Sequence, residues 1–412
     1  MDFSRYSPDH DYTDFPGAVF DCDMHLYETA ESFTRHLPKQ YSGLLRLAEV
    51  DGRTKMIVRG RISDYIPNPT FEVVAAPGSA IEFFSGKNTE GKDYREMITT
   101  MKAIPAFFDR DARLDLMDQM HISTILNFPT LASIVEVNFM DDPIGSQVLV
   151  HAFNQWLYED WGFQYKDRIY TTPIINLATV EGAIEELEWV LERGAKTVLI
   201  RPAPVAGTQG SKSPFLPYAD PFWARVQEAG IPVMFHASDS GYTRHANEWS
   251  GSDGEMRPFE FDVFADMSTS DRAIMDTVMS AVGHGMLSRF PGIRIGSIEN
   301  GSKWLKRVIE RMDSTYGKMP HLFKEHPRDV VARSLFVAPY WEDPLEPLLE
   351  LIGLEHVLFN SDWPHPEGLA DPNEYSRYML DEVGVSRADA DKIMGGNMYK
   401  LMGVDVPVAA AS

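Results

Sequence analysis

Short apolar runs bounded by turn residues recur along this chain, and stretches with helical periodicity lie between them. Eight runs have the composition of buried strands: Ala18–Phe20, Thr124–Asn127, Tyr170–Ile175, Thr197–Ile200, Pro232–Phe235, Ile293–Ile298, Leu335–Val337 and Val357–Phe359. An intervening stretch, Glu181–Arg193, gathers Ile184, Leu187 and Val190 on one face, as an amphipathic helix does. Strands that alternate with helices build parallel sheets. The pattern therefore favours an α/β fold, a (β/α)8 TIM barrel, over an open sheet.

Composition and charge limit the class of protein. With 412 residues and 44% hydrophobic content the chain can bury a large core, and we expect residues 1–412 to form a single domain. The formal net charge of −23 argues against nucleic acid or an anionic membrane surface as a partner, because both require a basic footprint. The N-terminus is polar and no apolar stretch approaches the roughly 18 residues that span a bilayer. We therefore expect a cytoplasmic protein that binds neither nucleic acid nor membrane.

One long segment departs from the repeat. Residues 26–110 separate the first two predicted strands, a distance far beyond the usual short connection. The segment contains strand-like pieces of its own, Thr54–Val58 and Phe71–Val74. We interpret it as a lid-like insertion over the mouth of the barrel; the alternative is a structural addition remote from the site. A second insertion, Ser238–Ser270, follows the fifth strand.

Polar residues that can bind metal ions follow several of the apolar runs. Asp21, Asp23 and His25 follow the first run at alternate positions, His236 follows the fifth, and Asp362 follows the eighth. In a parallel barrel the carboxyl ends of the strands meet at one face, so these side chains are expected to converge there. Each has a simpler explanation, a hydrogen-bonded Asp or a His packed in the core. The single cysteine excludes a cysteine-only zinc cluster, so a metal must use His and carboxylates.

Several motifs together resemble a known family. They are the Asp21-x-Asp23-x-His25 start and the segments Ala112–Asp118, Gly230–His236, Arg289–Arg294, Glu299–Gly301, Ser361–His365 and Ile393–Asn397. In their order and spacing they resemble the amidohydrolase superfamily, specifically the amidohydrolase-related branch that contains aminocarboxymuconate-semialdehyde decarboxylase and non-oxidative aromatic acid decarboxylases. The resemblance covers nearly the whole chain. It implies that Asp23, His25, His236 and Asp362 hold a metal.

Departures from the superfamily pattern narrow the expected chemistry. Binuclear members use a carbamylated Lys after the fourth strand, whereas this chain has Arg201, which stays protonated and cannot take that role. We therefore expect one divalent ion. The usual His-x-His pair is replaced by Asp23-x-His25, so both Zn²⁺ and Mn²⁺ are open as the cofactor. Glu299 stands where many relatives have His, and it could act as an acid/base or orient a ligand.

The resemblance favours one reaction and leaves others open. The first is non-oxidative decarboxylation of an aromatic or unsaturated carboxylic acid, in which Asp362 delivers a proton to the carbon that loses CO₂. The alternative is a hydrolase acting on lactones, amides or esters, or a hydratase, in which Asp362 takes a proton from the attacking water. A metal-binding scaffold without turnover is the third reading.

Other residues could contact a small-molecule carboxylate substrate. Arg201 and Arg244 could hold an acidic substrate's second carboxylate through a bidentate contact, although a surface ion pair explains each equally well. His365 and Trp363 belong to the last motif and are expected to line the pocket, with a structural turn as the other explanation for His365. Family resemblance suggests a homodimer or homotetramer.

Overall fold

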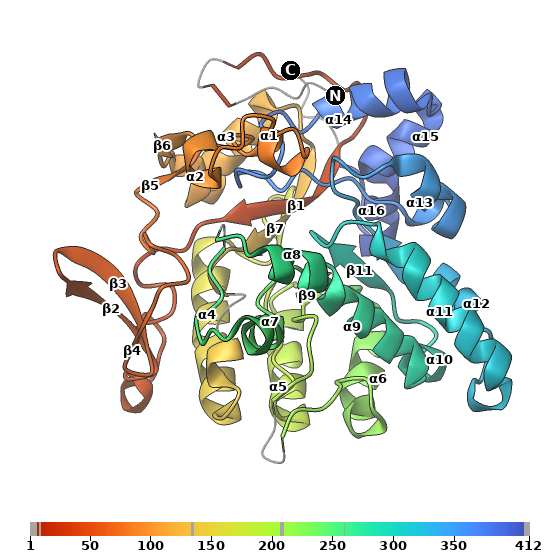
Figure 1. Cartoon of the computed structure of the whole chain (residues 1–412), viewed down its shortest axis with the longest axis horizontal. Helices are drawn as coiled ribbons and strands as arrows, with labels where there is room; N and C mark the ends of the chain where they lie inside the picture. Colours follow the sequence, from red (N-terminus) through yellow and green to blue (C-terminus); the bar gives the residue numbers. More distant parts are fainter. Residues whose placement is uncertain (1–5, 8–9, 133–135, 207–209, 259, 408–412) are drawn as a thin grey trace.

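The computed structural model describes residues 6–7, 10–132, 136–206, 210–258 and 260–407 (Figure 1). Its parallel strands form two sheets. One has the order β1-β7-β8, from β1 (Phe20–Leu26), β7 (Thr124–Pro129) and β8 (Ile169–Thr171). The other has the order β12-β11-β10-β9, from β9 (Val198–Leu199), β10 (Val233–His236), β11 (Ile295–Ile298) and β12 (Leu335–Val337). The predicted α/β class with parallel strands is confirmed.

Isolated contacts link the two sheets at both edges. Parallel bridges join Ile174 to Leu199, Val337 to Val357, and Met24 to Trp363. In addition, the Cys22 N–H donates to the Phe359 carbonyl at 3.0 Å. The segment after β12 therefore lies between β12 and β1, although it pairs too sparsely to form a regular strand.

The bounds of several predicted strands are corrected, and two of these corrections bear on the site. The first strand spans Phe20–Leu26 rather than Ala18–Phe20, so Asp23 and His25 lie within it. Polar residues were expected to end this strand, yet all seven of its residues are buried, because their polar side chains find partners elsewhere: His25 contacts His236 on β10, and Asp21 accepts from the Ser361 N–H. The predicted eighth strand, Val357–Phe359, is reduced to a single bridge and flanking hydrogen bonds.

Helices surround the parallel strands (Figure 1). The predicted helix is present as α5 (Val180–Leu191), which buries Ala183, Leu187 and Val190. The others flanking the strands are α3 (Arg110–Gln119), α4 (Pro143–Asp160), α6 (Asp220–Ala229), α9 (Arg272–Gly283), α10 (Met286–Arg289), α11 (Trp304–Lys318), α12 (Pro327–Ser334), α13 (Leu345–Ile352), α14 (Glu374–Arg377), α15 (Arg387–Asp391) and α16 (Asn397–Met402). Within the described ranges, no helix combines the length and apolarity that crossing a membrane requires.

The two insertions carry their own small elements. Residues 26–110 contain an antiparallel sheet of β2 (Leu45–Val50), β3 (Arg53–Val58) and β4 (Arg61–Ser63), which projects from the body of the molecule in Figure 1. They also contain the antiparallel pair β5 (Val73–Ala75) and β6 (Thr100–Lys102) with the short helices α1 (Ile81–Phe84) and α2 (Tyr94–Met97). The second insertion contains α7 (Tyr242–Ser250) and α8 (Val263–Thr269).

Candidate metal centre

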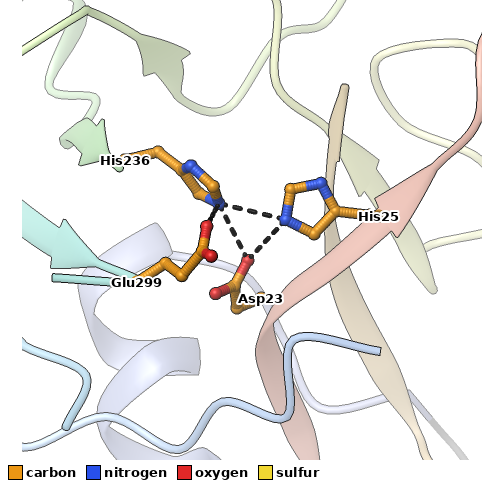
Figure 2. A group of neighbouring side chains, drawn as sticks. All are labelled: Asp23, His25, His236 and Glu299. Carbon is orange, nitrogen blue, oxygen red and sulfur yellow. Dashed lines mark hydrogen bonds and ion pairs between the residues drawn. The ribbon is translucent and has the colours of Figure 1, made fainter. Parts of the chain in front are cut away.

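Side chains from three separate strands meet at the carboxyl ends of the parallel sheets (Figure 2). His25 Nε2 lies 3.1 Å from His236 Nε2, and the Asp23 Oδ1 atom lies 3.4 Å from the first and 3.3 Å from the second. Glu299, which follows β11, brings its Oε2 atom to 3.1 Å from His236 Nε2. The ligand-type atoms of these four residues all lie within 4.8 Å of one another.

These separations fit a shared cation. Nitrogen and oxygen ligands of a divalent metal lie about 2.0–2.2 Å from the ion, so two neighbouring ligand atoms are separated by about 3.0–3.5 Å in tetrahedral or octahedral geometry. The triangle of Asp23, His25 and His236 has edges in this range. Asp23 Oδ2 is buried without a hydrogen-bond partner. Burying a carboxylate oxygen in this way costs folding free energy unless a cation or a donor compensates it. The donor set therefore fits one metal ion.

Both imidazoles are oriented by contacts at their other ring nitrogen. His236 Nδ1 lies 2.7 Å from the Ala237 carbonyl oxygen, which can only accept, so Nδ1 carries a proton and Nε2 is the ring nitrogen that faces the centre. His25 Nδ1 lies 3.4 Å from the hydroxyl of Thr130. Burial lowers the pKa of His25 well below its usual value, and the nearby His365 lowers it further. His25 is therefore neutral, as a metal ligand must be.

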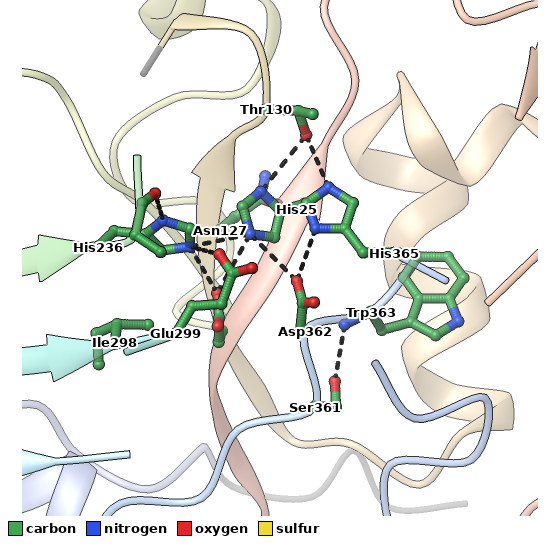
Figure 3. Close-up of polar contacts among 12 residues, drawn as sticks. His25, Asn127, Thr130, His236, Ile298, Glu299, Ser361, Asp362, Trp363 and His365 are labelled. Atoms are coloured by element: carbon green, nitrogen blue, oxygen red, sulfur yellow. Dashed lines mark hydrogen bonds and ion pairs between the residues drawn. The ribbon is translucent and has the colours of Figure 1, made fainter. Parts of the chain in front are cut away.

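A second group of acidic and imidazole side chains adjoins the first (Figure 3). Asp362 places Oδ1 at 3.5 Å from His25 Nε2 and at 2.7 Å from His365 Nδ1. Glu299, Asp362, His365 and Glu367 form a set whose ligand atoms also lie within 4.8 Å of one another. The Asp362 Oδ2 atom is buried and has no hydrogen-bond partner.

Several buried carboxylates are crowded together at this centre. Burial raises the pKa of Asp362 well above its ordinary value, and the neighbouring Glu367 and Asp23 raise it further. Burial also raises the pKa of Glu299, with Asp362 as the largest charged contributor. In the described part of the chain, no Lys or Arg forms an ion pair with Asp23, Glu299, Asp362 or Glu367. A divalent cation would supply the missing charge.

The backbone at two of these residues is in an unusual conformation. Glu299 has φ 52° and Asp362 has φ 56°, in the left-handed region that disfavours residues with a Cβ. Asp21 helps hold this end of the chain, because its Oδ1 accepts from the Ser361 N–H at 3.0 Å and from the Asp23 N–H at 3.1 Å. Strained backbone of this kind concentrates at functional sites.

Three residues that were predicted to contact the substrate lie away from the centre. Arg244 is exposed on α7 and pairs with Glu248 at 3.0 Å. Arg201 is buried and faces the Glu136 carboxylate at 3.3 Å. The Trp363 indole is fully buried with its ring under the Arg113 guanidinium. None of the three lines the cavity that opens at the metal centre, because their side chains are taken up by ion pairs or packing. His365, in contrast, lines it.

Sequence reasoning missed Thr130 and Glu367 at the centre, whereas Glu28 was considered as a helix cap or a residue that touches the site. Thr130 bridges His25 and His365 and follows β7 directly, so the rule that found the other strand-end residues could have found it. Glu28 is fully buried and its Oε1 accepts from the N–H groups of Leu131 and Ala132, which holds the loop that carries Thr130. No local sequence signal identifies Glu367; the turn after Asp362 places it at the centre.

A cavity of about 530 Å³ opens from the metal centre. His25, His236, Glu299, His365 and Glu367 form its floor, and most of its wall comes from the two insertions. A volume in the range of roughly 300–1,000 Å³ is typical of sites for small organic ligands.

Comparison with known proteins identifies the family. A family model described as an amidohydrolase matches residues 20–404. The chain belongs to the amidohydrolase family. The resemblance seen in the sequence is confirmed, and membership makes this amidohydrolase a metal-dependent decarboxylase or hydrolase. No match was found among curated proteins.

Solved structures resemble this amidohydrolase over most of its length. An amidohydrolase from Mycobacterium avium subsp. paratuberculosis K-10 is 39% identical with a TM-score of 0.90, over 95% of this chain and 100% of that one. A 5-carboxyvanillate decarboxylase from Novosphingobium aromaticivorans DSM 12444, complexed with manganese and 4-hydroxy-3-methoxy-5-nitrobenzoic acid, is 15% identical with a TM-score of 0.58, over 94% and 97%. A dihydroxybenzoic acid decarboxylase from Polaromonas sp. JS666, with bound manganese and 2-nitroresorcinol, is 18% identical with a TM-score of 0.56, over 79% and 93%.

Proposed function

We propose that this amidohydrolase is a mononuclear metal-dependent decarboxylase of an aromatic or unsaturated carboxylic acid. Asp23, His25, His236 and Asp362 would hold the ion; Glu299 belongs to the same group as the first three, and Asp362 reaches it from the adjoining group. When bound, the ion would neutralise the substrate carboxylate and fix its position. Manganese in the decarboxylases of similar fold supports Mn²⁺, and the imidazole pair leaves Zn²⁺ open.

The observation that carries the proposal is the position of Asp362. Its Oδ1 contacts His25 and His365, whereas its buried Oδ2 has no partner. In the proposed reaction Oδ2 carries a proton to a substrate carbon, and burial, with Glu367 and Asp23 nearby, raises the pKa of Asp362, which favours the protonated carboxyl. The proton and a π electron pair of the substrate form the new C–H bond; the carbon–carbon bond to the carboxylate then breaks, its electron pair restores the π system, and CO₂ leaves.

Neighbouring residues assist this transfer. His365 Nδ1 lies 2.7 Å from Asp362 Oδ1 and can return a proton to Asp362 after each turnover. We also interpret the two parallel sheets and the bridges between them as one (β/α)8 barrel, and residues 26–110 as a lid that excludes water from this step. A homodimer or homotetramer remains our expectation.

Hydrolysis is the second candidate, favoured by the amidohydrolase family model that covers the chain. The same unpaired Oδ2 of Asp362 could accept a proton from water attacking a lactone, amide or ester carbonyl. The experiment is a parallel screen of the Mn²⁺-loaded enzyme. Hydroxybenzoates and unsaturated acids are followed by CO₂ release, and lactones, amides and esters by acid formation. CO₂ release abolished in Asp362→Asn supports decarboxylation; acid formation without CO₂ would reject it.

A further inference from the structure

The cavity extends well beyond the metal centre. Its volume of about 530 Å³ exceeds what one six-membered ring fills, and lies in the range of roughly 300–1,000 Å³ that accommodates ligands of several rings. Residues of the first insertion, among them Tyr65, Ile66, Phe71 and Val74, form much of the wall. Space beyond the floor is therefore part of the site.

An aromatic wall leads outward from the proposed metal ligands. The ring of His365 lies 4.0 Å from that of His25 and 6.1 Å from that of Tyr27. Tyr27 in turn stacks on Phe71, with ring centroids 4.4 Å apart and planes 8° from parallel. Tyr27 and Phe71 both line the cavity, and aromatic side chains favour a flat aromatic ligand through offset or edge contacts.

The far end of the cavity is also aromatic. Phe84, Tyr94 and Phe261 line it and contact one another, with Tyr94 and Phe261 centroids 5.2 Å apart. This cluster joins the first insertion to the second. Phe261 is 45% exposed, so the apolar lining continues to the molecular surface.

Cationic groups in the lining are already paired. Arg95 contacts Glu260 at 2.8 Å, and Arg257 contacts Glu260 at 3.1 Å and Asp64 at 3.4 Å. These are the arginines that line the cavity in the described residues, and both side chains are exposed at its mouth. The outer cavity therefore offers apolar surface rather than a site for a second carboxylate.

We infer that the substrate is an aromatic acid with an extended apolar body, a fused-ring or biaryl carboxylic acid, rather than a single-ring benzoate. This inference rests on the proposed function for the placement of the carboxylate at the metal centre. The body lies against Tyr27 and Phe71 and reaches the cluster of Phe84, Tyr94 and Phe261. The reaction is unchanged: the aryl carboxylate takes up one proton and yields the arene and CO₂.

Two probes with the same head group test this inference. 2-Hydroxybenzoate and 1-hydroxy-2-naphthoate share the ortho-hydroxy carboxylate and differ by one fused ring. Their dissociation constants for the Mn²⁺-loaded enzyme are measured by calorimetry, separately from CO₂ release. Burying the second ring is expected to tighten binding at least about tenfold. Equal affinities, or tighter binding of the single ring, would overturn the inference.

Variants of residues that line the cavity test which part of it binds the second ring. Ala75→Trp, which fills the wall of the cavity, and Phe261→Ala, which removes an aromatic ring from its far end, should each weaken naphthoate binding several-fold and leave hydroxybenzoate binding unchanged. Met267→Ala is the matched control, because Met267 is 81% exposed and does not line the cavity. Unchanged naphthoate binding in both lining variants would also overturn the inference.

The two proposals fail differently. Tighter naphthoate binding without CO₂ release would support the substrate class and reject decarboxylation. CO₂ release from both acids with equal affinity would support decarboxylation and reject the substrate class. Absence of binding by either acid would reject both.

Discussion

The imidazoles of His25 and His236 face each other with their Nε2 atoms 3.1 Å apart, although 211 residues separate them in the chain. One lies on β1 and the other ends β10, which belong to different sheets. The pair therefore forms only when both sheets are assembled. A metal bound there should stabilise the folded state, since the unfolded chain cannot present both ligands together.

Metal content tests this directly. We expect the Mn²⁺-loaded enzyme to carry one equivalent per chain, and His236→Ala to weaken metal affinity by at least about 100-fold, because it removes a ligand rather than its support. Plasma mass spectrometry after dialysis measures the loss. His321→Ala, at an exposed position, is the control. Retention of a full equivalent in His236→Ala would reject the site.

The role of Asp362 is tested by a near-isosteric change. Asp362→Asn keeps an oxygen that can face the metal but removes the carboxyl proton, so kcat for CO₂ release should fall by about 10²–10⁴-fold. Metal content measured on the same sample separates lost proton transfer from lost metal. A variant with wild-type kcat would contradict the proposed role.

Close packing behind Asp362 gives a third prediction. A Cβ added at Gly368 would meet the Ser361 carbonyl oxygen and lie 2.6 Å from that of Asp362, so Gly368→Ala must displace the backbone that carries Asp362. We expect a loss of about 1–3 kcal/mol in unfolding free energy and reduced turnover. Gly317→Ala is the control, because its new methyl meets open space within α11 and should be neutral or slightly stabilising. Equal stability in the two variants would show that the turn can relax.

Arg113 is expected to be a structural requirement. It is fully buried, donates to the His25 carbonyl at 2.7 Å and to the Ala106 carbonyl at 2.8 Å, and burial lowers its pKa to about 9. Arg113→Met leaves both carbonyls without that donor and should cost roughly 3 kcal/mol in urea unfolding. Arg110→Met, on the same helix but partly exposed, should cost less than about 1 kcal/mol. A small effect at Arg113 would mean that water replaces its contacts.

The His151–Glu186 pair predicts a pH dependence of stability. A hydrogen bond to Glu186 raises the pKa of His151, while partial burial and Arg193 oppose the rise. Because the folded pKa lies above the unfolded one, the pair's contribution is complete below about pH 6.5 and is lost as pH rises through the folded pKa. The side chain is 40% exposed, so solvent screening limits the contribution to less than about 1 kcal/mol. Unfolding of wild type and His151→Gln should therefore differ more at pH 6 than at pH 8.5; a constant difference would contradict this.

The sequence was most informative where chemistry follows a buried strand. Asp23, His25, His236, Glu299, Asp362 and His365 were all selected this way, and the structure brings all six together. Arg201 and Arg244 were selected for their charge near predicted strand ends, and the structure places them in ion pairs with Glu136 and Glu248, because neither position nor charge predicts which acidic neighbour a guanidinium will meet. The boundaries of the first strand were misplaced because burial of its carboxylates depends on partners more than 200 residues away.

The metal centre and the cavity wall are built from different parts of the chain, and this has an evolutionary consequence. The metal centre is built on strand ends, whereas most of the cavity wall is built on two insertions that the strands do not need for pairing. Mutations in residues 26–110 or 238–270 can therefore reshape substrate choice while the catalytic floor stays intact. Homologues that differ mainly in these two segments are expected to share one reaction and to diverge in the compounds on which they perform it.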